Sequence, residues 1–274
     1  MPSIQAIAAR ASKTDGAAPW DEAAQMALEA GTAEVVTRDG CVAMALGDEL
    51  VLVTDPPLRG HGLATTLAET MLRQRPQLSR AWSHGNHPAA AALAAHFGWQ
   101  RVRDLWVMRR RVGRDAAPLP DLVVPGDVAL HSFGERPGDT EELLRVNAAA
   151  FAHHPEQGAM DVLNLAARMG EPWFDPEGLV MAAPRDGGPL LGFHWTKKHS
   201  RRLGEVYVVA VAPEAQGRGI GRLVTLAGLH HLVDTGVEEI LLYVEADNTA
   251  AIATYTSLGF THADHDTHVM YARP

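Results

Sequence analysis

One order of structural signals occurs twice along the chain, and this repeat limits the possible folds more than any other feature. In the first half, the apolar run Leu50-Val51-Leu52-Val53 is followed by a proline break, and Arg59-Gly60-His61-Gly62-Leu63-Ala64 then opens a pattern with helical spacing. In the second half, Val206 to Val211 is the apolar run, and Gln216-Gly217-Arg218-Gly219-Ile220-Gly221 opens the helical pattern. The repeat therefore predicts two similar units, each with a strand, a glycine turn and a helix in that order.

Both halves also end alike. An alanine-rich helical pattern closes on Phe97-Gly98-Trp99 or Leu258-Gly259-Phe260, and a last strand follows, with Val107-Met108 or Val269-Met270. Prolines between the halves indicate a linker. We therefore predict a first domain over 1–115, a linker over 116–126 and a second domain over 127–274. Strands that alternate with helices predict an α/β fold with a mixed sheet in each domain.

Composition narrows the class of partner. The formal net charge of −9 argues against nucleic acid, because proteins that bind it carry a basic face. No apolar run approaches the ~20 residues of a membrane span, and the start of the chain lacks a signal-peptide pattern. The apolar neighbours of the single cysteine, Cys41, predict a buried, unreactive thiol. We expect a cytoplasmic monomer that acts on a small molecule.

The repeated turn suits a phosphate group. Glycines let the backbone approach a ligand closely, and successive N–H groups at a helix N-terminus bind anions. Arg218, Arg222 and Arg59 add cations that can contact phosphate. A structural turn with surface arginines would look similar. Neither half has the Gly-x-Gly-x-x-Gly spacing of a dinucleotide-binding turn.

The order strand, Gln-x-x-Gly-x-Gly, helix, Asn-x-x-Ala and Tyr-x-x-x-Gly-Phe resembles the GCN5-related N-acetyltransferases (GNAT), and both halves match. The resemblance implies two tandem GNAT-like domains and acetyl-CoA as co-substrate. Five blocks of the second half are similar to the mycothiol synthase family, which acetylates the cysteinyl amine of desacetylmycothiol, a cysteine–glucosamine–inositol conjugate. These blocks are Asn147 to Phe151 with His154 to Gly158, Trp173 to Leu179, Gly192 to Lys197, Gly204 to Val209 and Leu242 to Asn248.

The resemblance implies two catalytic residues. Glu205 would be the general base, acting through a water, and Tyr255 the acid that protonates the coenzyme A sulfur. By residue type alone, a solvated strand end and a packed ring are the plainer interpretations. Counting back five residues from Trp99 gives Ala94, where the same count from Phe260 gives Tyr255. We therefore expect a first domain without the acid, although Glu49 stands near the position that matches Glu205.

The family resemblance also implies binding residues. The pantetheine arm would pair with Val209, Ala210 and Val211, and with Val51, Leu52 and Val53 in the first half. The phosphates would lie on Gln216, Gly217, Arg218, Gly219, Ile220, Gly221 and Arg222, or on Arg59, Gly60, His61, Gly62, Leu63 and Ala64. Asn248, Thr249, Ala250, Ala251, Ile252 and Ala253 would lie along the coenzyme, with a helix cap as the plainer role of Asn248. The amine substrate would contact Glu22, Glu156, Lys197, Glu205 and Tyr243.

No metal is expected. His262, His265 and His268 recur near the end of the chain, but no helical His/carboxylate motif or cysteine set accompanies them. Two other functions stay open. The first is a tandem acetyltransferase that acts on an antibiotic, polyamine or protein amine, and the second is an acyl-CoA-binding module without turnover.

Overall fold

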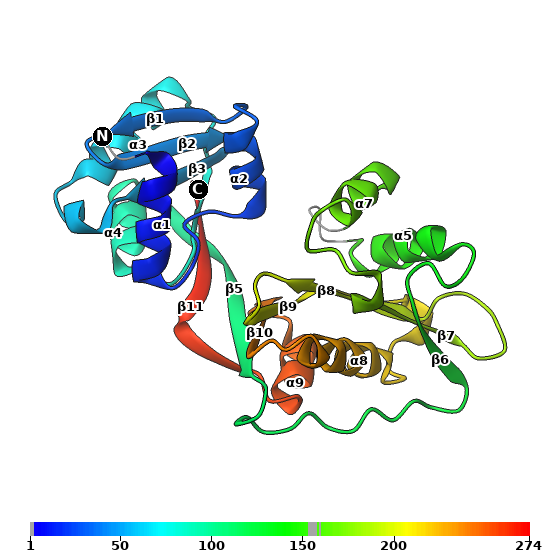
Figure 1. Cartoon of the computed structure of the whole chain (residues 1–274). Helices are drawn as coiled ribbons and strands as arrows, with labels where there is room; N and C mark the ends of the chain where they lie inside the picture. Colours follow the sequence, from blue (N-terminus) through cyan, green and yellow to red (C-terminus); the bar gives the residue numbers. More distant parts are fainter. Residues whose placement is uncertain (1–2, 153–157, 159) are drawn as a thin grey trace. The chain divides into compact units, whose positions relative to one another are not determined.

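The computed structural model describes residues 3–152, 158 and 160–274 (Figure 1). It is a mixed α/β structure, which confirms the predicted fold class. The chain forms two compact units that interleave along the sequence. The first unit comprises Met1–Val107, Glu245–Asp247 and His262–Pro274, and the second comprises Met108–Val244 and Asn248–Thr261.

A mixed sheet forms the centre of the first unit, with its strands in the order β1-β2-β3-β4-β11-β5. β1, β2 and β3 are antiparallel neighbours, β3 runs parallel to β4, and β4 runs antiparallel to β11. Cys41 is fully buried in β2, and burial raises the pKa of its thiol, as expected for an unreactive cysteine. The elements are α1 (Ile4–Asp15), α2 (Glu22–Glu29), β1 (Glu34–Arg38), β2 (Cys41–Leu46), β3 (Glu49–Thr54), η1 (Pro56–Leu58), α3 (Leu63–Gln74), β4 (Arg80–Ser83), α4 (Pro88–His96), β5 (Gln100–Arg111) and β11 (Thr261–Ala272).

The second unit has the strand order β6-β7-β8-β9-β10, with the end of β5 beside β10. Neighbours from β6 to β9 are antiparallel, whereas β9 and β10 are parallel. Figure 1 shows α8 on one face of this sheet and α5 and α7 on the other. The elements are β6 (Val128–Ser132), α5 (Asp139–Ala150), α7 (Val162–Met169), η2 (Pro176–Gly178), β7 (Leu179–Pro184), β8 (Gly192–Lys198), β9 (Leu203–Val211), η3 (Pro213–Ala215), α8 (Ile220–Asp234), β10 (Glu239–Glu245) and α9 (Thr249–Ser257).

The structure repeats the predicted order of strand, glycine turn and helix, as β3, η1 and α3 in the first unit and as β9, η3 and α8 in the second. The last strands depart from expectation. β11 was expected to close the second half, but it lies in the first unit, where Val269 pairs opposite Ser83 of β4. β5 begins in the first unit and ends in the second. The predicted boundaries, 1–115 and 127–274 around a linker at 116–126, describe the sequence repeat and stay a prediction.

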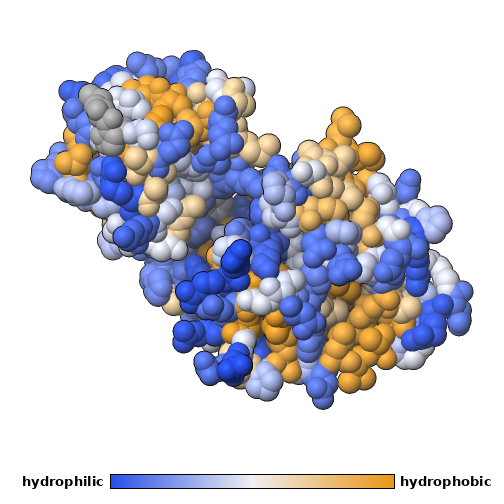
Figure 2. Space-filling model, viewed as in Figure 1, coloured by the Kyte–Doolittle hydropathy of each residue, from blue (hydrophilic) through white to orange (hydrophobic). Residues whose placement is uncertain are grey.

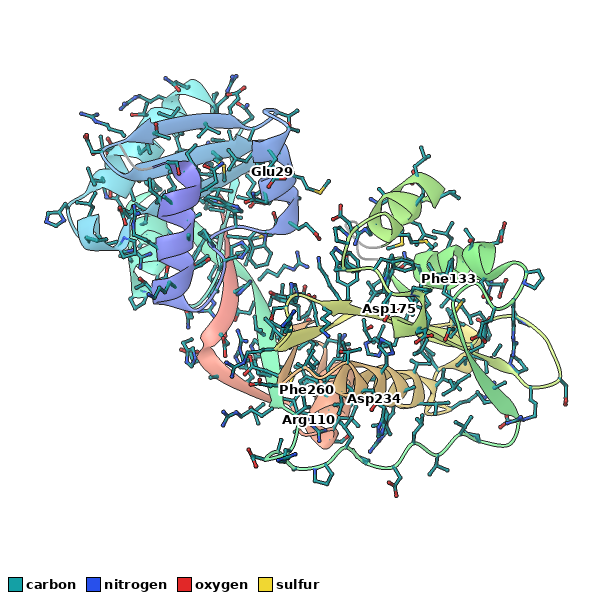
Figure 3. The ribbon with its side chains drawn as sticks, viewed as in Figure 1. Glu29, Arg110, Phe133, Asp175, Asp234 and Phe260 are labelled. Atoms are coloured by element: carbon teal, nitrogen blue, oxygen red, sulfur yellow. The ribbon has the colours of Figure 1, made fainter. Side chains whose placement is uncertain are left out.

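A buried arginine fastens the linker to the second unit. The guanidinium of Arg110, near Phe260 in Figure 3, donates to the carbonyl oxygens of Ala117 (3.1 Å) and Pro118 (3.0 Å). It also donates to the carbonyl oxygen of Leu258, directly after α9. A carbonyl past a helix end has lost its intrahelical partner, so this contact satisfies it. Arg110 thus holds the end of α9, the helix that carries Tyr255.

One helix leaves apolar side chains in solvent. Val162 and Leu163, at the start of α7, are 58% and 80% exposed, and Figure 2 shows hydrophobic surface over this helix. Leu165 is the buried residue of α7. Only part of the apolar surface of α7 therefore joins the core of the second unit.

His194 is fully buried between β8 and α8. Its Nδ1 lies 3.2 Å from the carbonyl oxygen of Val224, which an Nδ1–H group donates to. A Cβ on Gly228 would lie 2.1 Å from this nitrogen, so the imidazole occupies the space that a side chain at 228 would need. Burial lowers the pKa of His194 to about 4. The ring is therefore neutral in the folded protein at neutral pH.

This buried imidazole predicts a loss of stability in acid. Below pH 6.5, the ordinary pKa of histidine, the unfolded chain binds a proton that the folded chain does not bind until about pH 4. The free energy of unfolding should fall by about 3 kcal/mol between these pH values on account of His194 alone. Urea unfolding of the wild type and of His194→Gln gives the free energy of unfolding at each pH from 7 to 4. The contribution of His194 is the difference between the two proteins in how steeply this free energy falls with pH. An equal fall in both proteins would contradict the neutral buried imidazole.

Candidate active site

The glycine turn before α8 contains a row of backbone N–H groups without acceptors in the described chain. Gly217 and Gly219 have φ angles of 76° and 77°, and Gly219 is the N-cap of α8 without a capping side chain. Within the described chain, the N–H groups from Gly217 to Arg222 have no protein acceptor, and the bond from Leu223 to Gly219 (3.0 Å) closes the first helical turn. Such a row of N–H groups at a helix N-terminus suits an anionic ligand.

Two arginines accompany this turn. Nη2 of Arg218 lies 3.0 Å from Oδ2 of Asp127 in a partly exposed ion pair, and Arg222 is exposed in the first turn of α8. Exposed ion pairs contribute little free energy, so Arg218 can exchange Asp127 for a ligand phosphate at low cost. The turn therefore combines N–H groups with two available guanidinium groups.

Strands β9 and β10 pair over only part of their length. Their parallel register runs from Leu203 opposite Glu239 to Val206 opposite Leu242. β8 follows β9 further, to Val211, with a register shift that leaves Tyr207 as an extra residue. Among the described strands, the edge of β9 toward β10 is therefore open from Tyr207 to Val211. An extended, amide-containing ligand can pair with such an edge.

Glu205 lies just before this opening. It stands opposite Lys197 of β8 and Leu241 of β10, and its side chain is buried. Its Oε2 is 2.5 Å from Nε2 of His199, which lies in the turn between β8 and β9. A buried carboxylate needs such a partner to offset its desolvation. Glu205 is thus a buried, hydrogen-bonded group rather than a solvated strand end.

Two aromatic rings lie beside Lys197 of β8, one from β9 and one from the turn before η2. Its Nζ lies 4.4 Å from the ring centroid of Trp173 and 5.1 Å from that of Tyr207, which are cation–π distances. Trp195 packs against both rings, with centroids 5.8 Å from Trp173 and 5.6 Å from Tyr207. Arg168 of α7 donates to the Tyr207 hydroxyl. The bulged residue of β9 thereby joins an aromatic and cationic cluster beside Glu205.

Tyr255 lies in α9, where its ring meets Phe260 edge-on with centroids 6.0 Å apart. Burial raises the pKa of Tyr255 to about 12, so the phenol keeps its proton throughout the neutral range. Asn248 caps this helix, because its Oδ1 accepts the N–H of Ala251 at 3.1 Å. Asn248 thus has the capping role expected from its residue type, and Thr249 to Ala253 form the first turns of α9.

Comparison with known proteins identifies the family. The Acetyltransferase (GNAT) family matches residues 142–260. The mycothiol acetyltransferase of Nocardioides sp. is 52% identical, over 100% of this chain and 97% of its own length. Those of Gordonia bronchialis and Nocardia farcinica are each 46% identical, over 96% and 98% of this chain and 89% and 93% of their own lengths. The chain belongs to the mycothiol acetyltransferases.

Solved structures support the fold of this mycothiol acetyltransferase family member. A GCN5-related N-acetyltransferase from Sphaerobacter thermophilus has a TM-score of 0.75 at 22% identity, over 99% of this chain and 91% of its own. A tandem GNAT protein from the clavulanic acid biosynthesis pathway has a TM-score of 0.65 at 18% identity, over 87% and 81%. At these identities the likeness concerns the fold alone, and it agrees with the tandem GNAT arrangement inferred from the repeat.

The first unit keeps the turn but not its cations. Gly60 and Gly62 have φ angles of 80° and 74°, as their counterparts have in the second unit. Arg59, however, makes two 2.7 Å bonds to Asp15 of α1. His61 stands where the second turn has Arg218, with its Nδ1 2.9 Å from the carbonyl oxygen of Arg59. The N–H groups of this turn are thus accompanied by an arginine that is already paired.

A cavity of about 500 Å³ adjoins this first turn, lined by residues of β3, α3 and α4, among them Leu52, Leu63 and Ala94. Ala94 accepts the N–H of Trp99 at 2.8 Å, just as Tyr255 accepts that of Phe260 at 3.1 Å. The structural positions of Ala94 and Tyr255 therefore correspond, as the sequence count predicted. A second cavity, of about 380 Å³, lies at the C-terminal end of α8 beside His231, remote from the glycine turn.

The predicted substrate contacts are only partly brought together. Lys197 and Glu205 are cross-strand neighbours, and Tyr243 of β10 is 43% exposed. Glu22 begins α2 in the first unit, so its contact with the substrate stays a prediction. Glu156 lies outside the described residues. In the described chain, no helix is long and apolar enough to span a membrane, and no group of three His, Cys, Asp or Glu residues is placed to hold a metal ion.

The sequence did not single out His199, Trp173 or Tyr207 as site residues. Trp173 and Tyr207 stand inside family blocks, where aromatic residues are equally expected to fill the core. His199 lies six positions before Glu205, across a turn. Only the hairpin register of β8 and β9, with Lys197 opposite Glu205, places its ring beside the carboxylate.

Proposed function

We propose that the chain transfers the acetyl group of acetyl-CoA to the cysteinyl amine of desacetylmycothiol. The observation that carries this proposal is the 52% identity to the mycothiol acetyltransferase of Nocardioides sp., which extends over the whole chain. The geometry of the second unit supports it, because an anion-binding turn, an open strand edge, a buried carboxylate and a protonated phenol occur in one GNAT unit.

The second unit has the groups that acetyl-CoA requires. The N–H groups from Gly217 to Arg222, with Arg218 and Arg222, would bind the pyrophosphate. The open edge from Val209 to Val211 would pair with the amides of the pantetheine arm. The first turns of α9, from Asn248 to Ala253, would lie along the coenzyme. The N–H groups of the turn have no acceptor in the described chain, and Arg218 would exchange its exposed partner Asp127 for phosphate.

Glu205 and Tyr255 would move the protons. An amine with a pKa near ~8 must lose a proton before it attacks, and Glu205 would accept that proton through a water. The departing thiolate, with a pKa near ~8.5, needs a donor. Tyr255 would supply it, since its raised pKa keeps the phenol protonated at every pH in the working range. Glu205 thus acts on the nucleophile and Tyr255 on the leaving group.

The amine substrate would lie on the aromatic and cationic cluster. The Lys197 ammonium can donate to hydroxyl groups of the sugar and the inositol, and the rings of Trp173 and Tyr207 hold it in place. Glu156, Tyr243 and Glu22 would supply further polar contacts. The first unit would be non-catalytic, because Ala94 cannot act as an acid, while its N–H groups and cavity would still accept acetyl-CoA. We propose a cytoplasmic monomer that needs no metal, nucleic acid or membrane.

The test is product analysis with a thiol balance. Purified protein is incubated with acetyl-CoA and desacetylmycothiol, which carries a free thiol of its own. Acetylation of the amine releases coenzyme A and leaves that thiol intact, so one new thiol appears per acetylated molecule detected by mass. Acetylation of the thiol would give the same mass without any new thiol. Absence of acetylated product, or product without new thiol, would overturn the proposal.

Tyr255→Phe should lower kcat about 10²-fold, the usual contribution of a positioned acid or base, and leave the affinity for acetyl-CoA unchanged. Tyr271→Phe is the control for kcat alone, because burial also raises the pKa of Tyr271, which lies in the first unit and lines its cavity. Initial rates of acetylated product, with acetyl-CoA binding measured by calorimetry, separate the two variants. Equal kcat values for Tyr255→Phe and the wild type would contradict the acid role.

A further inference from the structure

The buried carboxylate of Glu205 has two oxygens with different surroundings. Oε2 is 2.5 Å from Nε2 of His199, so the two groups are in hydrogen-bond contact. The side chain of Glu205 is 8% exposed and that of His199 is 36% exposed, so the pair connects the buried strand to solvent. A base in this position must stay ionised despite desolvation, and a donor to one oxygen favours the ionised form.

The turn between β8 and β9 holds His199 rigidly. The N–H of His199 donates to the carbonyl oxygen of Leu203 at 3.0 Å, and that of Ser200 donates to the same oxygen at 3.3 Å. Oγ of Ser200 in turn accepts the N–H groups of Arg202 (3.2 Å) and Leu203 (3.1 Å). Four hydrogen bonds thus close a short turn, and they fix the backbone from which the imidazole reaches back to Glu205.

We propose that His199 is a positioning residue for the acetyl transfer, and that it donates from Nε2 to Oε2 of Glu205 so that Oε1 alone faces the amine. This inference rests on the proposed function, because it assigns a partner to the proposed base. The proton taken from the amine then passes through the water to Oε1, while the bond to His199 keeps the carboxylate ionised and oriented before each turnover. His199 itself gains and loses no proton in this step.

The conservative substitution distinguishes this role from a merely structural one. His199→Gln keeps an N–H donor within reach of Oε2, whereas His199→Ala removes it. A hydrogen bond to a charged group favours its ionised form, and His199→Ala removes that bond. The acidic limb of kcat/KM should therefore move to higher pH in His199→Ala and return toward the wild-type position in His199→Gln.

The charged groups on the neighbouring elements are unchanged in these variants. They therefore do not contribute to a difference in pH profile between either variant and the wild type. They are Lys197 and Lys198 of β8, Arg201 and Arg202 of the turn, Arg168 of α7, Glu238 before β10, Glu239 of β10 and Arg109 of β5.

The experiment measures kcat and KM for both substrates from pH 5.5 to 9 in the full chain, with N-acetyl product as the readout. We expect kcat at neutral pH to fall roughly 10-fold or more in His199→Ala, with the KM for acetyl-CoA unchanged. His265→Ala is the control, because His265 is an exposed histidine whose side chain is 82% accessible. Should His199→Ala fail to fold, His199→Asn, whose amide is too short to reach Oε2, replaces it in the comparison with His199→Gln.

The inference would be overturned if the wild type forms N-acetyl product and His199→Ala has the same kcat and the same acidic limb of kcat/KM as the wild type. The proposed function would then stay intact. Equal defects in His199→Ala and His199→Gln would also overturn it, because a lost donor is then not the cause. Absence of product from the wild type would instead overturn the proposed function, on which the inference rests.

Discussion

The chain depends on two left-handed glycines that stand on either side of Arg218, just before α8. Gly217 and Gly219 have φ angles near +76°, a region that side chains with a Cβ rarely adopt, and this conformation turns the chain sharply from β9 into the helix. Because the same turn leaves the N–H groups from Gly217 to Arg222 without acceptors in the described chain, it offers a place suited to an anion. The strand that leads into it is the one that separates from β10 after Val206. Turn, strand opening and helix are therefore continuous along the chain, and Glu205 is the next-to-last residue of β9 that pairs with β10.

The first unit shows that the glycine turn and the helix start can occur without the side chains proposed for catalysis. It has the same glycine angles and the same helix start, yet Arg59 is occupied by Asp15 and Ala94 stands at the position of Tyr255. The backbone geometry follows from the glycines, whereas the cations and the phenol are side chains that can change without disturbing the fold. Ligand binding and acid chemistry thus depend on different parts of the structure. We propose that the two units differ in the acid chemistry.

Local features of the fold could be predicted from the sequence, and long-range ones could not. The repeat, the glycine turns, β3 and β9, and the correspondence of Ala94 with Tyr255 follow from short patterns in which neighbouring residues determine the backbone. The pairing of β11 with β4 does not, because two terminal strands of similar pattern can complete either sheet. The His199–Glu205 bond and the cluster around Lys197 depend on hairpin register, which sequence spacing does not specify. The cavity of the first unit depends on side-chain packing in three elements and has no sequence pattern of its own.

The most direct measurement compares turnover in Gly219→Asp and Gly62→Asp, a matched pair because both glycines are helix N-caps with positive φ and open space around the missing Cβ. Aspartate is among the few residues with a Cβ that enter the left-handed region, and its backbone strain should be similar in the two variants, so a fold defect would affect both. Its carboxylate would repel a pyrophosphate at the N–H groups. The account predicts that Gly219→Asp lowers the rate of acetyl transfer at a fixed, subsaturating acetyl-CoA concentration at least about tenfold, equivalent to ~1.4 kcal/mol, and that Gly62→Asp retains the wild-type rate. An equal loss in both variants, or a loss in Gly62→Asp alone, would contradict the claim that the second unit performs the chemistry.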